Sequence, residues 1–352
     1  MHNREVWRIG RLGALDRLER QTRPLADQGP GEARVAVKAI GLNFADAFAC
    51  LGLYSATPAG GFIPGLEVAG VVEALGPVRS PAGAGPALWP GDRVFGVTRF
   101  GGYASAVNLD LRYLRPIPPA WGFAEAAAFP VQALTAWYGL IELGAVKAGD
   151  LVLLQSAAGG VGLNALAILA GCSARVIAAV GRAAKRDFLV EHAGLAPDHV
   201  IVRERRGFGA QLDRALAAAR ADGLDLVFDA VAGPFFSPAY RRMHTAGRYV
   251  VYGAADFMPR RPRMHYLPLA LRYLRRPRLD PLRMIQENRS VMAFNLIWLW
   301  DQAERLPRAF GEIERLIRTP PLVGRRFPFA EAPAALRHLQ SGESIGKVVL
   351  EV

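Results

Sequence analysis

The stretch LVLLQSAAGGVG, residues 151–162, decides the fold of this chain. A continuous apolar run ends in small residues and glycines, and it leads into the helical pattern LNALAILA. Such a run is typical of a buried parallel strand, and the turn after it is where a phosphate can bind. Ala157, Gly159 and Gly162 have the spacing of a dinucleotide-binding turn, although alanine replaces the first glycine. Glycines at short intervals also occur in ordinary tight turns, so the flanking sequence has to decide.

The flanking sequence repeats the strand pattern. RVIAAV, residues 175–180, follows the expected helix as a second apolar segment and completes one βαβ unit. Similar runs at residues 223–233, 247–255 and 291–299 predict further strands, and therefore an open, doubly wound parallel sheet. Ligands of such sheets bind beyond the carboxyl ends of the strands. We therefore expect Val231, Gly253 and residues 294–296 on the rim of a cofactor site.

The residues after the second strand indicate which nucleotide binds. An Asp or Glu there would accept a hydrogen bond from a free ribose hydroxyl, but the chain continues with GRAAKR and has no carboxylate before Asp187. Cations suit a 2′-phosphate. The sequence therefore predicts NADPH, with Arg182 and Lys185 as its partners. Arg186 fits a solvated helix start equally well.

Length and charge set further bounds. A chain of 352 residues is expected to form two domains. Residues 260–289 hold nine arginines against Asp280 and Glu287, a formal charge of +7, interleaved with leucines and tyrosines. This basic segment is compatible with an anionic membrane surface, with the phosphates of CoA or a carrier protein, or with a solvated excursion. We expect no nucleic-acid partner, because no recognised binding module accompanies it.

Cysteine content and hydropathy indicate the compartment. Cys50 and Cys172 are the only cysteines, too few for a disulfide framework or a four-cysteine zinc site, so we expect a reducing cytoplasm. The first ten residues, MHNREVWRIG, lack the apolar core of a secretory signal. The most apolar stretch, residues 151–180, is interrupted by glycines and polar residues, so we predict no membrane-spanning helix.

Before the nucleotide unit the chain has short alternating segments and Gly-Pro turns, which predict a β-rich domain. An ordered set of segments carries a resemblance: VAVKAIGLNFADAFACLGLY, PGLEVAGVVEALG, GDRVFG, GGYAS, AAAFPVQALTAWYGL, AAGGVG and the closing IGKVVLEV. Together they resemble the medium-chain dehydrogenase/reductase superfamily. The resemblance is to its zinc-independent quinone oxidoreductase branch, the group of zeta-crystallin. Asn43 and Leu66 stand where cysteine and histidine zinc ligands would fall. The stretch from GRYVVYG to ENRSVMAFNLIWL is most similar to the vesicle amine transport protein-like subgroup.

The resemblance implies an α/β fold with a GroES-like β-rich catalytic domain, residues 1–125 and 322–352. A Rossmann domain, residues 126–321, would lie between them and carry the basic insertion at residues 257–289. The resemblance also implies NADPH in the interdomain cleft, reduction of quinones or α,β-unsaturated carbonyls, and homodimers joined through residues 291–299.

Residue roles follow from the same resemblance. Asn43, Asp46 and Tyr54 would line the nicotinamide side, and Gly159, Gly160 and Val161 would hold the pyrophosphate. Arg203 would contact the adenosine phosphate where many relatives have a tyrosine. The full set expected to bind the cofactor is Asp46, Thr135, Ala158, Gly159, Gly160, Val161, Gly181, Arg182, Lys185, Arg203, Tyr252, Gly253, Phe294, Leu296 and Lys347.

Hydride transfer without a metal requires hydrogen-bond donors for the developing negative charge. Asn43 and Tyr54 are the expected catalytic residues: both can donate to the substrate, and Tyr54 or solvent would supply the later proton. In the alternative interpretation Asn43 closes a turn and Tyr54 fills a lid. Asp46 is expected to hold the local backbone or a neighbouring side chain rather than to act as an acid. Two rival functions stay open: a cofactor-binding protein that docks on membranes or partners through the basic segment, and a zinc alcohol dehydrogenase with displaced ligands.

Overall fold

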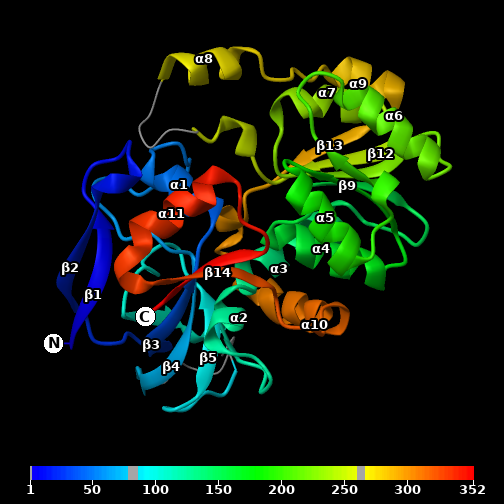
Figure 1. The fold of residues 1–352 in the computed structure, drawn as a ribbon. Coiled ribbons are helices and arrows are strands. Elements are labelled where there is room, and N and C mark those ends of the chain that lie inside the picture. Colours follow the sequence, from blue (N-terminus) through cyan, green and yellow to red (C-terminus); the bar gives the residue numbers. More distant parts are fainter. Residues whose placement is uncertain (1, 78–85, 260–265) are drawn as a thin grey trace.

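A computed structural model describes residues 2–77, 86–259 and 266–352, apart from the side chains of Tyr266 and Ala303. Arg260, Arg261 and Arg263 of the basic segment lie outside the described residues. Two large sheets organise the rest of the chain (Figure 1). One sheet is parallel, and its strand at residues 151–155 leads into the glycine turn predicted from the sequence. The other sheet is mostly antiparallel and combines strands from the N-terminal and C-terminal parts of the chain.

The parallel sheet has six strands in the order β10-β9-β8-β11-β12-β13. Its strands are β8 (Leu151–Gln155), β9 (Arg175–Val180), β10 (Val200–Val202), β11 (Leu224–Asp229), β12 (Met243–Val251) and β13 (Ser290–Ala293). All five residues of β8 are buried, as the continuous apolar run requires of a central strand. The βαβ unit β8–α4–β9, with α4 spanning Gly160–Gly171, confirms the dinucleotide-type topology.

The last strand is shorter than the sequence predicted. Residues 291–299 were expected to form one strand, but β13 ends at Ala293 and residues Leu296–Leu299 form a 3₁₀ helix. The neighbouring strand β12 ends at Val251, the partner of Ala293, and the Phe294 N–H makes the last contact with it by donating to the Val251 carbonyl at 3.1 Å. The chain therefore turns away from the sheet immediately before Asn295.

The second sheet has the order β14-β15-β3-β4-β5-β7, with β6 also pairing with β3. Its strands are β3 (Glu32–Gly41), β4 (Glu67–Leu75), β5 (Arg93–Val97), β6 (Ala106–Asp110), β7 (Leu114–Pro116), β14 (Val323–Pro328) and β15 (Lys347–Glu351). A hairpin of β1 (His2–Ile9) and β2 (Leu18–Leu25) lies beside it. The red C-terminal strands thus complete the sheet of the blue N-terminal ones (Figure 1).

Helices cover both sheets. They are α1 (Phe44–Cys50), α2 (Phe123–Ala127), α3 (Pro130–Trp137), α5 (Ala183–Ala193), α6 (Phe208–Ala218), α7 (Phe236–Tyr240), α8 (Tyr266–Leu274), α9 (Pro281–Glu287), α10 (Leu306–Leu316) and α11 (Ala332–Ser341). This is the predicted α/β fold with a β-rich part and a Rossmann-type part. The boundaries at residues 125 and 322 stay predictions.

Two features connect the sheets to the site described below. The start of β15 reaches the glycine turn, where the Gly346 N–H donates to the Ala158 carbonyl at 2.9 Å. Helices α8 and α9, which carry the basic segment, lie at the periphery of the molecule (Figure 1). No helix among the described residues is long and apolar enough to cross a bilayer, and both cysteines are free thiols.

Candidate active site

A cavity of about 1320 Å³ runs between the two sheets. It is larger than the roughly 300–1,000 Å³ typical of small-molecule sites, so it has room for a dinucleotide and a second molecule. The carboxyl ends of β8, β9, β11 and β12 open into it on one side, and α1 and the start of β15 border it on the other. The rim residues predicted from the strand ends, Val231, Gly253 and residues 294–296, all line this cavity.

The glycine turn forms one wall. Gly159 is the N-cap of α4, and Gly159, Gly160 and Val161 line the cavity with Ala158. A Cβ atom on Gly160 would come within 1.7 Å of Gln132, and one on Gly162 within 2.4 Å of the Ala157 carbonyl oxygen. At Gly162 the obstacle is backbone, so only glycine allows this close packing of helix on turn there. The N-terminal amides of a twelve-residue helix face the cavity, where they favour an anion.

A cluster of cations follows β9. Arg182, Lys185 and Arg203 line the cavity beside Gly181. Burial, together with the charges of Arg203 and Arg182, lowers the pKa of Lys185 to about 8. Among the described residues, Arg182 is the only member of this group with a carboxylate as an ion-pair partner, Glu343 at 3.2 Å, and that pair is half exposed. Lys185 has no ion-pair partner among the described residues, so this phosphate-end cluster (Arg182, Lys185 and Arg203) is suited to receive an anion.

Arg203 is held rigidly within this cluster. Its Nη1 donates to Gln155 Oε1 at 2.8 Å and to the Ala179 carbonyl at 3.0 Å, and its guanidinium lies 5.5 Å from the centre of the Phe235 ring. Burial lowers the pKa of Arg203 to about 10, so the group remains a cation at neutral pH. Gln155 and Phe235 were not predicted from the sequence, because nothing local links them to Arg203.

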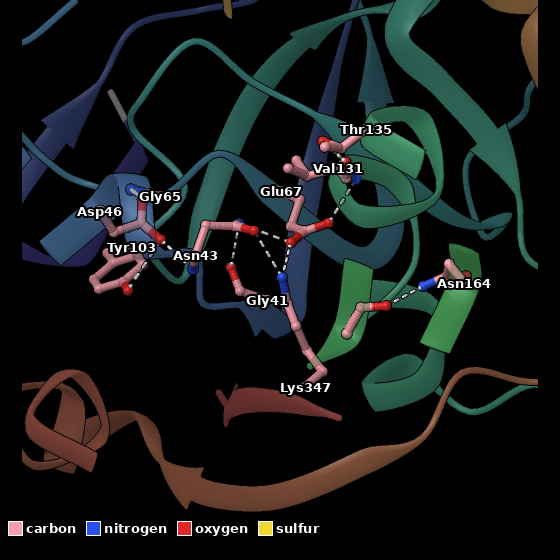
Figure 2. Close-up of polar contacts among 11 residues, drawn as sticks. Gly41, Asn43, Asp46, Gly65, Glu67, Tyr103, Val131, Thr135, Asn164 and Lys347 are labelled. Atoms are coloured by element: carbon pink, nitrogen blue, oxygen red, sulfur yellow. Dashed lines mark hydrogen bonds and ion pairs between the residues drawn. The ribbon is translucent and has the colours of Figure 1, made fainter. Parts of the chain in front are cut away.

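The floor of the cavity holds a second, buried cation (Figure 2). Lys347 is 1% exposed, and its ammonium group donates to Asn43 Oδ1 at 2.8 Å and forms an ion pair with Glu67 Oε1. With its amide in the orientation that satisfies both ends, Gln132 donates to the Ala128 carbonyl and accepts from Lys347 Nζ at 2.8 Å. Burial lowers the pKa of Lys347, whereas the Glu67 charge opposes that shift. We call Asn43, Glu67, Gln132 and Lys347 the floor network.

Glu67 completes the floor network from β4. Its Oε1 accepts from Asn43 Nδ2 at 2.8 Å, and its Oε2 accepts from the Val131 N–H at 2.9 Å. Its side chain is fully buried. Glu67 was not among the residues predicted from the sequence, although a charged residue directly after Leu66 in the apolar context GLEVAG was a signal for a buried polar partner.

The structure changes the interpretation of Asn43. Its two amide hydrogens point to Glu67 Oε1 at 2.8 Å and to the Gly41 carbonyl at 3.4 Å, and its oxygen accepts from Lys347. Asn43 lines the cavity, but its donors are engaged within the protein rather than free. Only the long bond to Gly41 is weak enough to be exchanged easily.

Asp46 does not line the cavity, contrary to its expected place among the cofactor-binding residues. It is completely buried and forms a capping box at the start of α1: its Oδ2 accepts from the Asn43 N–H at 2.8 Å (Figure 2). Its Oδ1 accepts from the Gly65 N–H at 3.1 Å. Burial raises the pKa of Asp46 to about 7. Asp46 therefore holds the local backbone, as expected of a residue that does not act as an acid.

Tyr54 projects into the cavity from the chain after α1. Its hydroxyl donates to Asn295 Oδ1 at 2.8 Å, a contact between residues 241 positions apart. Burial raises the pKa of Tyr54 to about 12, so it stays protonated at neutral pH. Thr135 also lines this region, and its hydroxyl donates to the Val131 carbonyl at 2.6 Å, which leaves its oxygen able to accept.

Aromatic residues form another part of the cavity wall. Phe294 packs against Tyr138 and Tyr252, with ring centres 5.0 and 6.3 Å apart, and Tyr252 stacks on Phe228 at 4.2 Å. Phe294, Leu296 and Tyr252 line the cavity. Every residue of the predicted site except Asp46 therefore lies on this one cavity.

A zinc ion does not fit the floor. The side chains there are an amide, a carboxylate already paired with an ammonium group, and that ammonium group itself. Zinc requires thiolate, imidazole or free carboxylate ligands. Within the described residues, no group of three or more His, Cys, Asp or Glu side chains could hold a metal ion.

Comparisons with known proteins agree with this geometry. Residues 29–135 match the alcohol dehydrogenase GroES-like domain, and residues 196–350 match a zinc-binding dehydrogenase domain. The chain is 30% identical to the synaptic vesicle membrane protein VAT-1 homolog of Rattus norvegicus, over 96% of this chain and 82% of that protein. It is 34% identical to the spectinabilin polyketide synthase system protein NorB of Streptomyces orinoci over 93% of this chain, but spans only 13% of that protein.

A solved structure agrees as well. The quinone oxidoreductase from Thermus thermophilus, which was also crystallised as a complex with NADPH, is 31% identical to the chain. It superposes with a TM-score of 0.75 over 99% of this chain and 100% of that one. Fold and site thus define an oxidoreductase built from a GroES-like and a Rossmann-type part. The chain belongs to the medium-chain dehydrogenase/reductase family, in the zinc-independent quinone oxidoreductase branch that includes the VAT-1 homologues.

Proposed function

We propose that this protein is a zinc-independent, NADPH-dependent reductase of quinones or α,β-unsaturated carbonyls, including enoyl groups. The observation that carries the proposal is the pairing of two ends of one cavity. One end has the glycine turn and the phosphate-end cluster, in which Lys185 and Arg203 have no carboxylate as an ion-pair partner among the described residues, and the other has Tyr54 among apolar side chains. When bound, the cofactor would supply hydride from its nicotinamide ring.

The phosphate end would hold the cofactor as follows. The amides of Gly159, Gly160 and Val161 would bind the pyrophosphate at the N-terminus of α4. Lys185 and Arg203, with Arg182 at the more exposed edge, would bind the 2′-phosphate. A phosphate there would offset both the burial of Lys185 and its repulsion by Arg203 and Arg182, which together lower the Lys185 pKa. At the other end, backbone groups of Phe294 and Leu296 would bind the carboxamide.

The chemistry then depends on side chains of this chain. The acceptor would lie between Tyr54 and the aromatic wall, where the Tyr54 O–H would turn from Asn295 Oδ1 and donate a hydrogen bond to the oxygen that becomes negative. A substrate oxygen could also displace the long Asn43–Gly41 bond. A phenol whose pKa is about 12 stays protonated and still donates its proton to a strongly basic carbanion. Lys347 would act at a distance, as a fixed positive charge below the site.

A substrate screen tests this function. Oxidation of NADPH is followed by its absorbance against quinones, linear enones and enoyl thioesters, in parallel with NADH. Turnover of at least one class, with NADPH preferred, is the expected result. Tyr54→Phe should then lower kcat by about 10²- to 10⁴-fold, the usual contribution of a positioned proton donor. Absence of both NADPH binding and turnover across the panel would contradict the proposal.

A second candidate function rests on helices α8 and α9. Seven of the eleven large apolar side chains exposed in the described chain lie at residues 267–285, among them Leu282 at 71% and Ile285 at 75% exposure. They are interleaved with arginines, of which Arg275 and Arg278 have no ion-pair partner among the described residues. Exposed apolar groups beside cations are typical of helices that lie on an anionic bilayer. We propose that this face binds anionic membranes peripherally.

Vesicle sedimentation tests the membrane proposal. The protein should sediment with phosphatidylglycerol vesicles but not with phosphatidylcholine vesicles, and salt should release it because exposed charges are screened. The double variant Arg275→Glu/Arg278→Glu should abolish binding, whereas a matched change outside this segment, Arg220→Glu, should not. Indifference to lipid charge and salt would contradict the proposal. Competition by CoA without any effect of lipid would indicate a phosphate-bearing soluble partner instead.

The homodimer expected through residues 291–299 is also a proposal. Strand β13 stands at the end of the parallel sheet, and among the described strands it pairs only with β12. An open edge of this kind can continue into the sheet of a second copy. Sedimentation velocity should give a mass close to twice 38.1 kDa; a 38.1 kDa particle at micromolar concentration would contradict the dimer.

A further inference from the structure

The contact between Tyr54 and Asn295 spans the cavity from one sheet system to the other. Tyr54 follows α1 in the β-rich part, and Asn295 follows β13 in the parallel sheet, in the turn that replaced the predicted end of that strand. Both residues line the cavity and are half-buried. The contact was not predicted, because sequence spacing gives no indication that two residues 241 positions apart meet.

The amide of Asn295 has one engaged end and one free end. Its Oδ1 accepts from the Tyr54 hydroxyl at 2.8 Å. Although Asn295 is the N-cap of the 3₁₀ helix Leu296–Leu299, its side chain makes no capping hydrogen bond. Within the described part of the chain, Nδ2 has no hydrogen-bond partner. The amide can therefore turn about its Cβ–Cγ bond without breaking any contact other than the one with Tyr54.

The side-chain amide of Asn can form a hydrogen bond with both protonation states of Tyr, with its oxygen toward a phenol or its N–H toward a phenolate. A neutral phenol donates to the amide oxygen, whereas a phenolate can only accept and would be bound by the amide N–H. A hydrogen bond to a charged group is stronger than one between neutral groups. Burial raises the pKa of Tyr54, and the Asp46 carboxylate disfavours the phenolate further. In the observed orientation the phenol donates to Asn295 Oδ1, which stabilises the neutral form, whereas an Nδ2–H turned toward the oxygen would stabilise the phenolate. Asn295 is thus the neighbour placed to offset the cost of ionising Tyr54.

We propose that Asn295 is a positioning residue for proton transfer: it holds the Tyr54 hydroxyl as an acceptor before the reaction and turns to donate Nδ2–H to the tyrosinate afterwards. This inference rests on the proposed reductase function. The acceptor gains hydride at its electrophilic atom and becomes an anion. The Tyr54 O–H bond then breaks, its proton forms the new C–H or O–H bond of the product, and its electron pair stays on the phenolate. A proton from solvent restores Tyr54.

The sign of one pKa change tests the proposal without turnover. Tyr54 is replaced by 2,3,5-trifluorotyrosine, a more acidic phenol that titrates while the protein stays folded, and ¹⁹F NMR follows its ionisation in the absence of cofactor. Asn295→Leu in this background should raise the pKa at position 54 by about 1, because the phenolate loses its donor. Asn295→Ala should give a smaller rise, since water can enter and donate in place of the amide.

The opposite outcome has a clear meaning. An amide that only accepts would stabilise the neutral phenol, so its removal would lower the pKa; a fall, or no change, in Asn295→Leu would overturn the proposal. Ser55→Ala, next to Tyr54 on the same cavity, is the matched control and should leave the pKa unchanged. In turnover assays, Asn295→Leu should lower kcat more than tenfold with little change in KM. An inactive wild-type protein would refute the reductase function, whereas the NMR titration would still decide the role of Asn295.

Discussion

Two sets of cations border the same cavity, and they differ in what neutralises them. Lys347 in the floor network is fully buried, paired with Glu67 and bound by the oxygens of Asn43 and Gln132. Lys185 in the phosphate-end cluster is half-buried, has two arginines beside it and has no carboxylate as an ion-pair partner among the described residues. The ammonium group of Lys347 is thus satisfied by the protein, whereas that of Lys185 is left to bind an external anion.

The difference indicates where binding free energy is available. A buried charge that is already paired within the protein gains little from a ligand. Removing that charge by mutation would instead leave its buried partner uncompensated. A cluster of like charges gains from any anion that neutralises it. We therefore expect changes at Lys347 to alter mainly folding stability, and changes at Lys185 to alter mainly cofactor affinity.

The largest effect is expected at the floor. Lys347→Met leaves the Glu67 carboxylate buried with no cation, which should lower the free energy of unfolding by about 3–5 kcal/mol. Urea denaturation followed by circular dichroism measures this. The double variant Lys347→Met/Glu67→Gln removes the unpaired charge and should recover most of the loss. A single variant that is destabilised by less than about 1 kcal/mol would mean that the ion pair is not an essential part of the floor.

The next effect should appear in affinity rather than stability. Lys185→Ala is expected to weaken NADPH binding about 10- to 100-fold, the contribution of one charge-assisted hydrogen bond, and to change NADH binding by less than about twofold. Fluorescence titration of the reduced cofactors gives both constants. Equal losses for the two cofactors would show that Lys185 does not contact the 2′-phosphate.

These two regions also differ in how far the sequence predicted them. The phosphate end was predictable because its parts are local: the glycine turn, the helix and the cations after β9 lie within residues 151–186, and Arg203 follows the next strand directly. The floor network was not, because Lys347 and Glu67 are 280 positions apart and meet only through sheet pairing. Asn43 was identified, but its donors could not be assigned without Glu67. Likewise, the apolar run 291–299 could not reveal that β12 ends at Val251.

A pH dependence distinguishes Lys185 from the arginines beside it. Its pKa in the free protein is about 8, below the ordinary 10.5, and a bound phosphate would raise it again. Above pH 8 most of the Lys185 side chain is the neutral amine, which must take up a proton before it binds the phosphate as a cation, so NADPH affinity relative to NADH should fall, by up to about tenfold from pH 7 to pH 9. Lys185→Arg keeps its charge and should give a flat profile; a flat profile in the wild type would refute the assignment.

The smallest effect is expected at Arg186, and it tests whether position or total charge decides binding. Arg186 lies one residue beyond Lys185 on α5, but it does not line the cavity; its guanidinium is directed to the Pro197 carbonyl at 3.4 Å and to Asp187 at 4.0 Å. Exposed charges at such distances contribute little in physiological salt. Arg186→Ala should therefore change NADPH affinity by less than about twofold, measured by the same titration as Lys185→Ala. A loss comparable to that of Lys185→Ala would mean that the general positive field of α5, rather than direct contact with Lys185 and Arg203, binds the phosphate.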